Sequence, residues 1–201
     1  MTNSGRNQVE THIEISIENR NRATVFFRPL LVLPVFAFVW LFDQFNNDNN
    51  WSTLVLGLPV AAAMVFRNVY PSWLLSFNHA ALEFSTRLGA YALLLTDDYP
   101  TFERNPKVAV IFPDVEGGKK LNRWLPLVKW FLAIPLYIVG IFYSLIAAIC
   151  TVFAAIHIIL FKKYPDPVIN IVLGTLKYWN RVIGYAGILV TDEYPSFKLN
   201  A

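Results

Sequence analysis

Long apolar runs separated by short polar segments dominate this chain of 201 residues. The longest run covers residues 125–161 and contains only Lys129 and His157 as ionisable side chains. It has no polar stripe of the kind that a surface helix of a soluble protein shows every three or four residues. About 20 apolar residues cross the hydrocarbon core of a bilayer, so the run is long enough for two crossings. With Gly140 and Ser144 near its middle as the place of a bend, it predicts a transmembrane helical hairpin.

A second apolar region occupies residues 23–42 and 51–66. Its two parts are separated by residues 43–50, an acidic and amide-rich segment that we expect in water. The second part is short for a span, which local thinning of the bilayer accommodates. We therefore predict another transmembrane hairpin, over about residues 24–66.

Two short segments show the alternation that is typical of half-exposed strands. In residues 9–17, the side chains of Ile13, Ile15 and Ile17 fall on one face and polar side chains fall on the other. Residues 107–112 form a second strand-like run, ahead of the longest apolar run. We therefore expect a minor β component in a mainly helical protein.

Between residues 71 and 95, apolar residues recur at spacings of three and four, which place them on one face of a helix. These residues are Trp73, Phe77, Ala81, Phe84, Leu88, Tyr91 and Leu95. Four polar side chains lie largely off this face: His79, Glu83, Thr86 and Arg87. The pattern predicts an amphipathic helix in the membrane interface, and a second one is expected at about residues 166–190. A helix that crosses the membrane is the alternative, and it would bury Asn78, His79, Glu83 and Arg87 at a cost of several kcal/mol.

The two halves of the chain repeat the same order of segments. Each half closes with a similar motif, Thr96-Asp97-Asp98-Tyr99-Pro100-Thr101-Phe102 and Thr191-Asp192-Glu193-Tyr194-Pro195-Ser196-Phe197. Further pairs of corresponding residues are Asn21 and Asn122, Arg28 and Lys129, Pro34 and Pro135, Tyr70 and Tyr164, Arg87 and Arg181, and Tyr91 and Tyr185. We predict an all-α membrane protein with minor β, built from two tandem repeats, residues 9–102 and 107–197. Each repeat has a short strand, a transmembrane helical hairpin and an interfacial amphipathic helix, and both are oriented alike about an axis along the membrane normal.

Composition and charge fit a membrane protein. Hydrophobic residues make up 55% of the chain and charged residues 15%, below the usual soluble share of about a quarter. Neither predicted hairpin loop contains any of the 17 Lys and Arg residues. The positive-inside rule therefore predicts a multi-pass protein with both termini and both amphipathic helices in the cytoplasm. The net charge of +3 suits the anionic lipids of an inner leaflet better than nucleic acid.

The closing motifs contain the candidate acidic residues. Asp97 and Asp98 in the first motif correspond to Asp192 and Glu193 in the second. Carboxylates can bind a divalent cation or serve as acid and base. No histidine accompanies them at ligand spacing, however, and we expect them to lie in water and to cap the turns that Tyr99-Pro100 and Tyr194-Pro195 set. We expect no catalytic residue, no metal and no cofactor, because the sequence also has no nucleotide-binding or zinc motif.

The candidate lipid-binding residues are basic and occur in corresponding pairs. Arg87 and Arg181 are placed to bind a lipid phosphate or to pair with the acids of the closing motifs. Arg28 and Lys129 begin the apolar runs, and we expect them to extend to the cytoplasmic headgroups. His157 lies well inside the last run and is a functional candidate because ionisable groups are rare in membranes. The structural alternative is a neutral imidazole that bonds to a neighbouring helix or turns to the interface near Phe161. Two prolines, Pro34 and Pro135, are expected to kink the first helix of each hairpin.

Several of these motifs together resemble a known family. The segments are Arg-Pro-Leu-Leu-Val-Leu-Pro from Arg28 and Asn-Arg-Trp-Leu-Pro-Leu-Val-Lys-Trp-Phe-Leu-Ala-Ile-Pro from Asn122, with the Tyr-Pro pairs and the closing motifs. They resemble the bacterial integral-membrane family catalogued as domain of unknown function 4389, present here as two tandem copies. The resemblance implies a protein of the bacterial inner membrane and supplies no activity.

The sequence thus favours a non-catalytic membrane scaffold or accessory subunit of a bacterial inner-membrane complex, which holds lipid and either another membrane protein or a second copy of itself. Two alternatives remain open. One is a lipid-binding or lipid-transport component in which Arg87 and Arg181 hold the phosphate. The other is a membrane enzyme that uses the paired acids.

Overall fold

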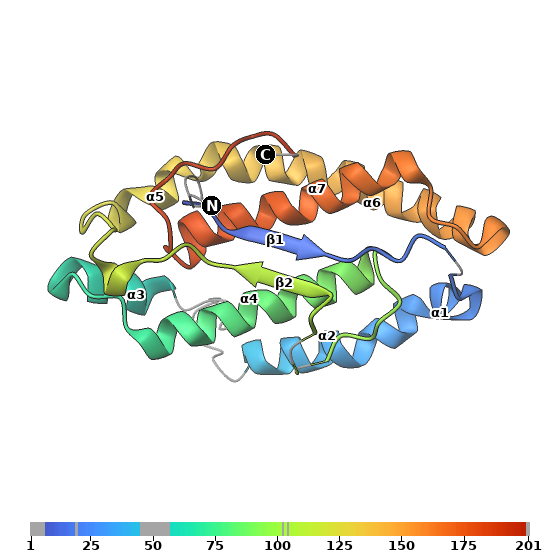
Figure 1. The fold of residues 1–201 in the computed structure, drawn as a ribbon, viewed down its shortest axis with the longest axis horizontal. Coiled ribbons are helices and arrows are strands. Elements are labelled where there is room, and N and C mark those ends of the chain that lie inside the picture. The colour runs from blue at the N-terminus through green and yellow to red at the C-terminus, as the bar shows by residue number, and fades with distance from the viewer. Residues whose placement is uncertain (1–6, 19, 45–56, 102, 104, 200–201) are drawn as a thin grey trace, which may run out of the picture.

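The computed structural model describes residues 7–18, 20–44, 57–101, 103 and 105–199, with backbone alone for residues 38–44. Its elements, in chain order, are β1 (Glu10–Ile13), α1 (Arg22–Phe26), α2 (Arg28–Gln44), α3 (Gly57–Arg67), α4 (Ser72–Ala92), β2 (Val108–Ile111), the 3-10 turn η1 (Glu116–Gly118), α5 (Pro126–Leu132), α6 (Ile134–Phe161), α7 (Asp166–Val182) and the π-helical turn η2 (Ile183–Gly187) (Figure 1). The protein is therefore mainly helical with one small sheet, as the sequence predicts.

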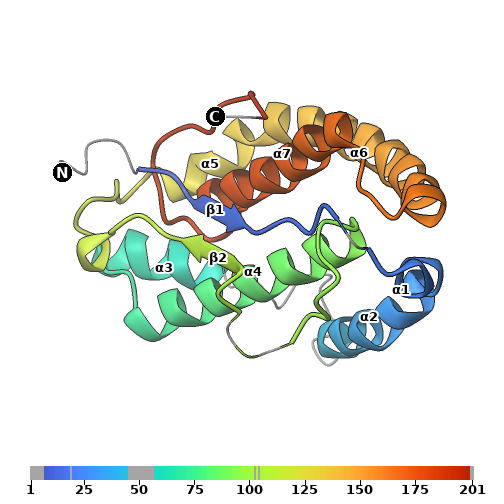
Figure 2. The same ribbon diagram turned by 45° about the vertical axis from the view of Figure 1, so that its right-hand side comes forward.

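The two predicted strands form one antiparallel pair. Glu10 lies opposite Ile111 and Ile13 lies opposite Val108. The alternation is confirmed within β1, where Thr11 is buried and His12 is exposed, but the strand ends at Ile13 and Ile17 is exposed. Each strand packs on the amphipathic helix of the other half, β1 on α7 and β2 on α4, so that the pair lies between these helices in both ribbon views (Figures 1 and 2). The two halves are thus interlocked rather than side by side.

The helix α6 corrects the expected second hairpin. It runs unbroken from Ile134 to Phe161 through Gly140 and Ser144, where the bend was expected. Both small residues instead make room for Trp179 of α7. The indole nitrogen of Trp179 donates to the Ser144 hydroxyl at 2.8 Å, and a Cβ on Gly140 would lie 2.8 Å from the indole ring. With no proline after Pro135 in this run, nothing in its backbone ends the helix.

In the described residues, each of the two apolar regions has a break between helices near its beginning. The break between α5 and α6 falls at Ala133, two residues before Pro135, and thus confirms an interruption near that proline. In the first half the break falls at Phe27, between α1 and α2, and the helix continues through Pro34. Pro34 thus lies inside α2 and does not end the helix.

Only part of the first predicted hairpin can be compared with the structure. Its two arms contain α2 and α3, with 17 and 11 residues, and residues 45–56 between them lie outside the described part. Among the described residues, α6 is the one helix long and apolar enough to cross a membrane. Four crossings are therefore not supported.

The two amphipathic helices are confirmed as α4 and α7, but their polar faces point inward. Glu83 and Arg87 of α4 are only 7% and 5% exposed, whereas Trp73 is 66% exposed. An interfacial amphipathic helix would turn this polar face to the headgroups and water, whereas the structure buries it. The physical reason is that the helices pack against each other, so polar groups of one half satisfy those of the other. The amide of Asn180 in α7, for example, donates to the Thr86 hydroxyl of α4 at 2.9 Å.

Candidate functional site

The acid of the first closing motif lies in a buried cationic cluster. Asp97 Oδ1 is 2.6 Å from the Arg28 guanidinium and 3.1 Å from that of Arg20. Arg28 and Arg20 are 3% and 1% exposed. The expectation that Arg28 extends to the headgroups is therefore wrong, because Asp97, which lies 69 residues further along the chain, binds it inside the protein.

The chain that precedes Asp97 completes this cluster. Arg28 donates to the carbonyl oxygens of Tyr91 at 2.9 Å and Thr96 at 2.8 Å, and its guanidinium lies 3.9 Å above the Tyr91 ring. Burial lowers the pKa of Arg28, and the charges of Tyr91 and Asp97 oppose that shift. These contacts join the beginning of α2 to the end of α4.

The second closing motif forms the corresponding cluster. Lys129 Nζ is 2.6 Å from Asp192 Oδ1, donates to the Thr191 carbonyl at 2.6 Å and lies 5.3 Å from the centre of the Tyr185 ring. Its side chain is buried, so Lys129 does not extend to the headgroups either. Burial lowers its pKa, and the hydrogen bond and charge of Asp192 oppose that shift. The cation, acid, carbonyl and aromatic ring thus come from the positions that match in the two halves of the sequence.

The second acids of the motifs lie on the surface, as expected. The backbone N–H groups of Asp98 and Glu193 donate to the hydroxyls of Thr96 and Thr191, at 3.2 and 3.1 Å, so threonines rather than the acids cap these turns. The expectation that all four acids lie in water is wrong for Asp97 and Asp192, which bind buried cations. Asp98 also pairs with the exposed Lys107 at 2.8 Å.

The aromatic and proline residues of the motifs pack these turns onto the protein. Tyr99 lies edge-on to Tyr91 at 5.5 Å, and Tyr194 lies edge-on to Tyr185 at 5.6 Å. The prolines that follow them, Pro100 and Pro195, are buried. In the part of the chain that the structure describes, no three His, Cys, Asp or Glu side chains come together as a metal site.

Arg87 and Arg181 take equivalent structural positions. Both are buried, at 5% and 4% exposure. Arg87 donates to the carbonyl of Glu103 at 2.9 Å, and Arg181 donates to the carbonyl of Lys198 at 2.5 Å. Both acceptors lie four residues after the tyrosine of a closing motif. The two arginines therefore hold the segments that follow the motifs.

Two buried tyrosines, which sequence reasoning noted only as part of the repeat, join the halves. The hydroxyl of Tyr70, just before α4, donates to the carbonyl of Ile188 at 2.8 Å. The hydroxyl of Tyr164, just before α7, donates to the carbonyl of Leu93 at 3.3 Å. Each Tyr-Pro pair is thus bonded to the end of the other half's helix. The repeated Tyr-Pro pair was the signal for this contact, but nothing in it indicates the partner.

The burial of Tyr70 predicts a pH dependence of stability. Burial raises the pKa of Tyr70 from 10.0 to about 12. The neutral phenol is favoured in the folded state, so its contribution is complete below pH 10 and is lost as the pH rises through about 12. Tyr70→Phe should therefore lose less stability than the wild type between these pH values, measured by denaturant unfolding. Tyr99→Phe, whose ring is 45% exposed in the wild type, should follow the wild type, and identical pH profiles for all three proteins would contradict the prediction.

His157 has a local partner near the end of α6. Its Nδ1 lies 2.8 Å from the carbonyl of Lys163, and its ring lies 4.7 Å from that of Phe161. The bond supports the structural alternative for this histidine, with a partner in the connection to α7.

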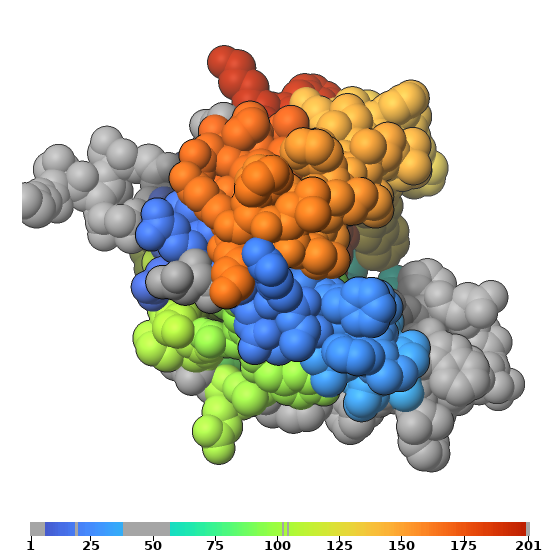
Figure 3. All heavy atoms as spheres, turned by 90° about the vertical axis from the view of Figure 1, so that its right-hand side faces the viewer, coloured from blue at the N-terminus to red at the C-terminus, as the bar shows by residue number. Residues whose placement is uncertain are grey.

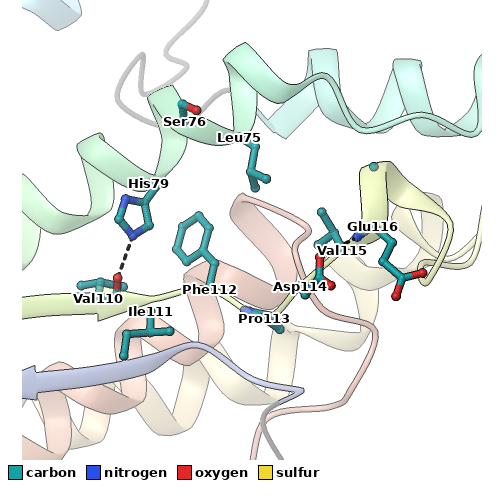
Figure 4. Close-up of a pocket in the computed structure, with 11 residues that line it drawn as sticks. Leu75, Ser76, His79, Val110, Ile111, Phe112, Pro113, Asp114, Val115 and Glu116 are labelled. Carbon is teal, nitrogen blue, oxygen red and sulfur yellow. Dashed lines mark hydrogen bonds between the residues drawn. The ribbon is translucent and has the colours of Figure 1, made fainter. Parts of the chain in front are cut away.

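One open cavity of about 540 Å³ lies between α4 and the chain from β2 to η1 (Figure 4). His79 Nε2 bonds to the carbonyl of Val110 at 2.7 Å, and Phe112 lies edge-on to the His79 ring. Asp114, at the other end, accepts the N–H of Glu116 and pairs with Lys120 at 3.4 Å. Sequence reasoning did not find this cavity, because its walls come from the two halves of the chain. The side chains of His79, Asp114 and Glu116 have partners within the protein, so we assign no reaction to this cavity.

Comparison with known proteins bears on the second half of the chain. No curated protein and no solved structure matches. Residues 124–198 contain α5, α6, α7 and the second acidic cluster, and they match the model of the family described as Domain of unknown function (DUF4389).

Proposed function

We propose that the protein is a non-catalytic scaffold or accessory subunit of a membrane complex, bound to the membrane mainly through α6. One observation carries this proposal. The most apolar window of α6 is only 17% buried within the protein, although the helix has 28 residues. The core helix of a soluble protein would be mostly covered, so lipid or another protein must cover α6.

The geometry of α6 supports contact with lipid. Its buried stripe includes Gly140, Ala147 and Ala154, which repeat every seven residues and pack towards α7. Ile149 follows Ala147 by two residues, and Ile156 follows Ala154 by two, which places both isoleucines on the opposite side of the helix. They are 72% and 55% exposed. A helix that is apolar on all sides is typical of a hydrophobic surrounding. A continuous exposed apolar surface along a helix indicates an interaction surface.

The positions of the polar residues favour a scaffold over the two alternatives. Asp97 and Asp192, the acids that an enzyme would use, are engaged with buried cations. Arg87 and Arg181, the candidates for a lipid phosphate, are buried and bonded to backbone carbonyls. We therefore assign the two clusters a structural role, as equivalent parts of tandem repeats at residues 9–102 and 107–197. The proposed location is the bacterial inner membrane with both termini cytoplasmic, and the proposed partners are anionic lipids and a membrane protein or a second copy.

Fractionation and co-purification test this proposal. The protein should stay with membranes after a high-salt wash, leave them only in detergent, and purify in mild detergent with lipid and a stoichiometric protein partner or as an oligomer. The pellet and supernatant fractions show membrane retention and detergent extraction, and native mass spectrometry shows the bound lipid and the protein partner or oligomer. A salt-extracted or monodisperse, lipid-free monomer would overturn the proposal.

A further inference from the structure

Given the proposed membrane location, we infer that α6 lies in the plane of one anionic leaflet, with Arg123 near one end and Arg22, Lys162 and Lys163 near the other bound to phospholipid phosphates. This inference rests on the proposed function and goes beyond it, because it fixes the orientation of the protein and the chemistry of the lipid.

The length and ends of α6 are the first argument. A helix of 28 residues is about 42 Å long, whereas the hydrocarbon core is about 30 Å thick. Exposed cations lie at both ends of the rod formed by α5 and α6: Arg123 precedes it, and Lys162 and Lys163 follow it. A single crossing would place these ends in opposite compartments, against the positive-inside rule. A helix in the plane of the membrane places both ends at the same surface.

The end near α5 has the chemistry of the headgroup layer. The Arg123 guanidinium lies 5.5 Å from the Trp124 ring, which is 61% exposed. Arg123 also donates to the carbonyl of Phe66 at 3.3 Å, and the Phe66 ring is 79% exposed. Indole rings beside cations favour the boundary between acyl chains and headgroups. This end therefore presents a cation and exposed aromatic rings together to the headgroup layer.

The opposite end is formed by α1 and the last turn of α6, which lie against each other in the end-on view (Figure 3). Arg22 donates to the carbonyl of Leu160 at 2.8 Å. The exposed rings of Phe26 and Phe161, at 69% and 67%, lie on these same two elements. Lys162 and Lys163 are exposed immediately after Phe161, and Lys163 has Asp166 at 3.4 Å. Cations next to exposed apolar side chains match an anionic bilayer surface.

The rest of the fold agrees with a position in the plane. The helix α7 lies alongside α6, so a crossing α6 would take Lys177 of α7 into the membrane. In the end-on view, the first part of α6 and α2 lie towards the right, whereas the chain around β1 lies towards the left (Figure 3). The apolar helices thus share one side of the molecule, and His12 and Glu14 of the first strand segment are exposed elsewhere.

Accessibility of single thiols tests the orientation. Arg123→Cys and Lys163→Cys are made separately in a Cys150→Ala background and exposed to a membrane-impermeant reagent. Both positions should label in inverted inner-membrane vesicles and neither in intact cells. Labelling of the two positions from opposite sides would overturn the inference but leave the proposed function standing. Failure of the wild type to stay with membranes would instead contradict the proposed function.

Lipid selection tests the headgroup contact. Solubilised protein is mixed with equimolar phosphatidylglycerol and phosphatidylcholine, and the retained lipid is measured by native mass spectrometry. The wild type should retain phosphatidylglycerol preferentially. Arg22→Gln with Lys162→Gln and Lys163→Gln should reduce that preference by about tenfold or more, since each cation near an anionic surface contributes about fivefold. The control replaces three other exposed lysines, none of them in either proposed contact: Lys107→Gln, Lys119→Gln and Lys198→Gln. An equal loss in the control, or no loss in the first variant, would overturn the headgroup contact.

Discussion

Asp97→Asn should lower the free energy of unfolding by about 3–5 kcal/mol, because it leaves two buried guanidinium groups without their counter-charge. Arg20 and Arg28 both bind this carboxylate and have almost no access to water. An amide keeps the shape of the side chain and loses the charge. Denaturant unfolding of the detergent-solubilised protein, followed by tryptophan fluorescence, measures the loss.

The adjacent residue provides a matched control. Asp98 pairs with Lys107, and both side chains are more than 40% exposed. Asp98→Asn should therefore change the free energy of unfolding by at most about 1 kcal/mol. Asp192→Asn should destabilise the protein in the same way as Asp97→Asn, since Lys129 is equally buried. Equal effects of the changes at residues 97 and 98 would show that the buried clusters contribute no more than surface pairs.

Ile149→Asp together with Ile156→Asp should release the protein from the membrane. These residues lie on the side of α6 that faces away from α7 and are largely exposed. Each aspartate costs about 2.5–3.5 kcal/mol at the centre of the hydrocarbon and less towards the headgroups. The loss should appear as a shift of the folded protein from the membrane pellet to the supernatant, or as a fall in its membrane abundance.

The same substitution on the sheet is the control. Ile111 ends β2 and is 38% exposed. Ile111→Asp adds one aspartate of the same kind without placing it on α6, so the protein should stay in the membrane pellet. The proposal that α6 contacts lipid fails if the double variant remains membrane-bound to the same extent as the wild type while keeping its fold.

Local pattern was enough to predict the two strands and the two amphipathic helices. Period-two alternation predicted the segments that become β1 and β2, and spacings of three and four predicted α4 and α7. The matching of residues 28 and 129 and of residues 97 and 192 also came from the sequence. The sequence did not indicate that residue 28 binds residue 97 or that residue 129 binds residue 192. Each pair is separated by more than 60 residues, so only the fold brings its members together.

What the sequence by itself determined, then, is the apolar character of the chain and the location of its strands and amphipathic helices, since both follow from the side chains of neighbouring residues. Only the tertiary structure decided how polar faces and bends are used. Glu83 and Arg87 turn inward because the other half of the protein supplies partners for buried polar groups. Gly140 and Ser144 stay within a straight helix because Trp179 fills the space beside them. Both outcomes depend on contacts between distant segments, and hydrophobic periodicity carries no information about those contacts.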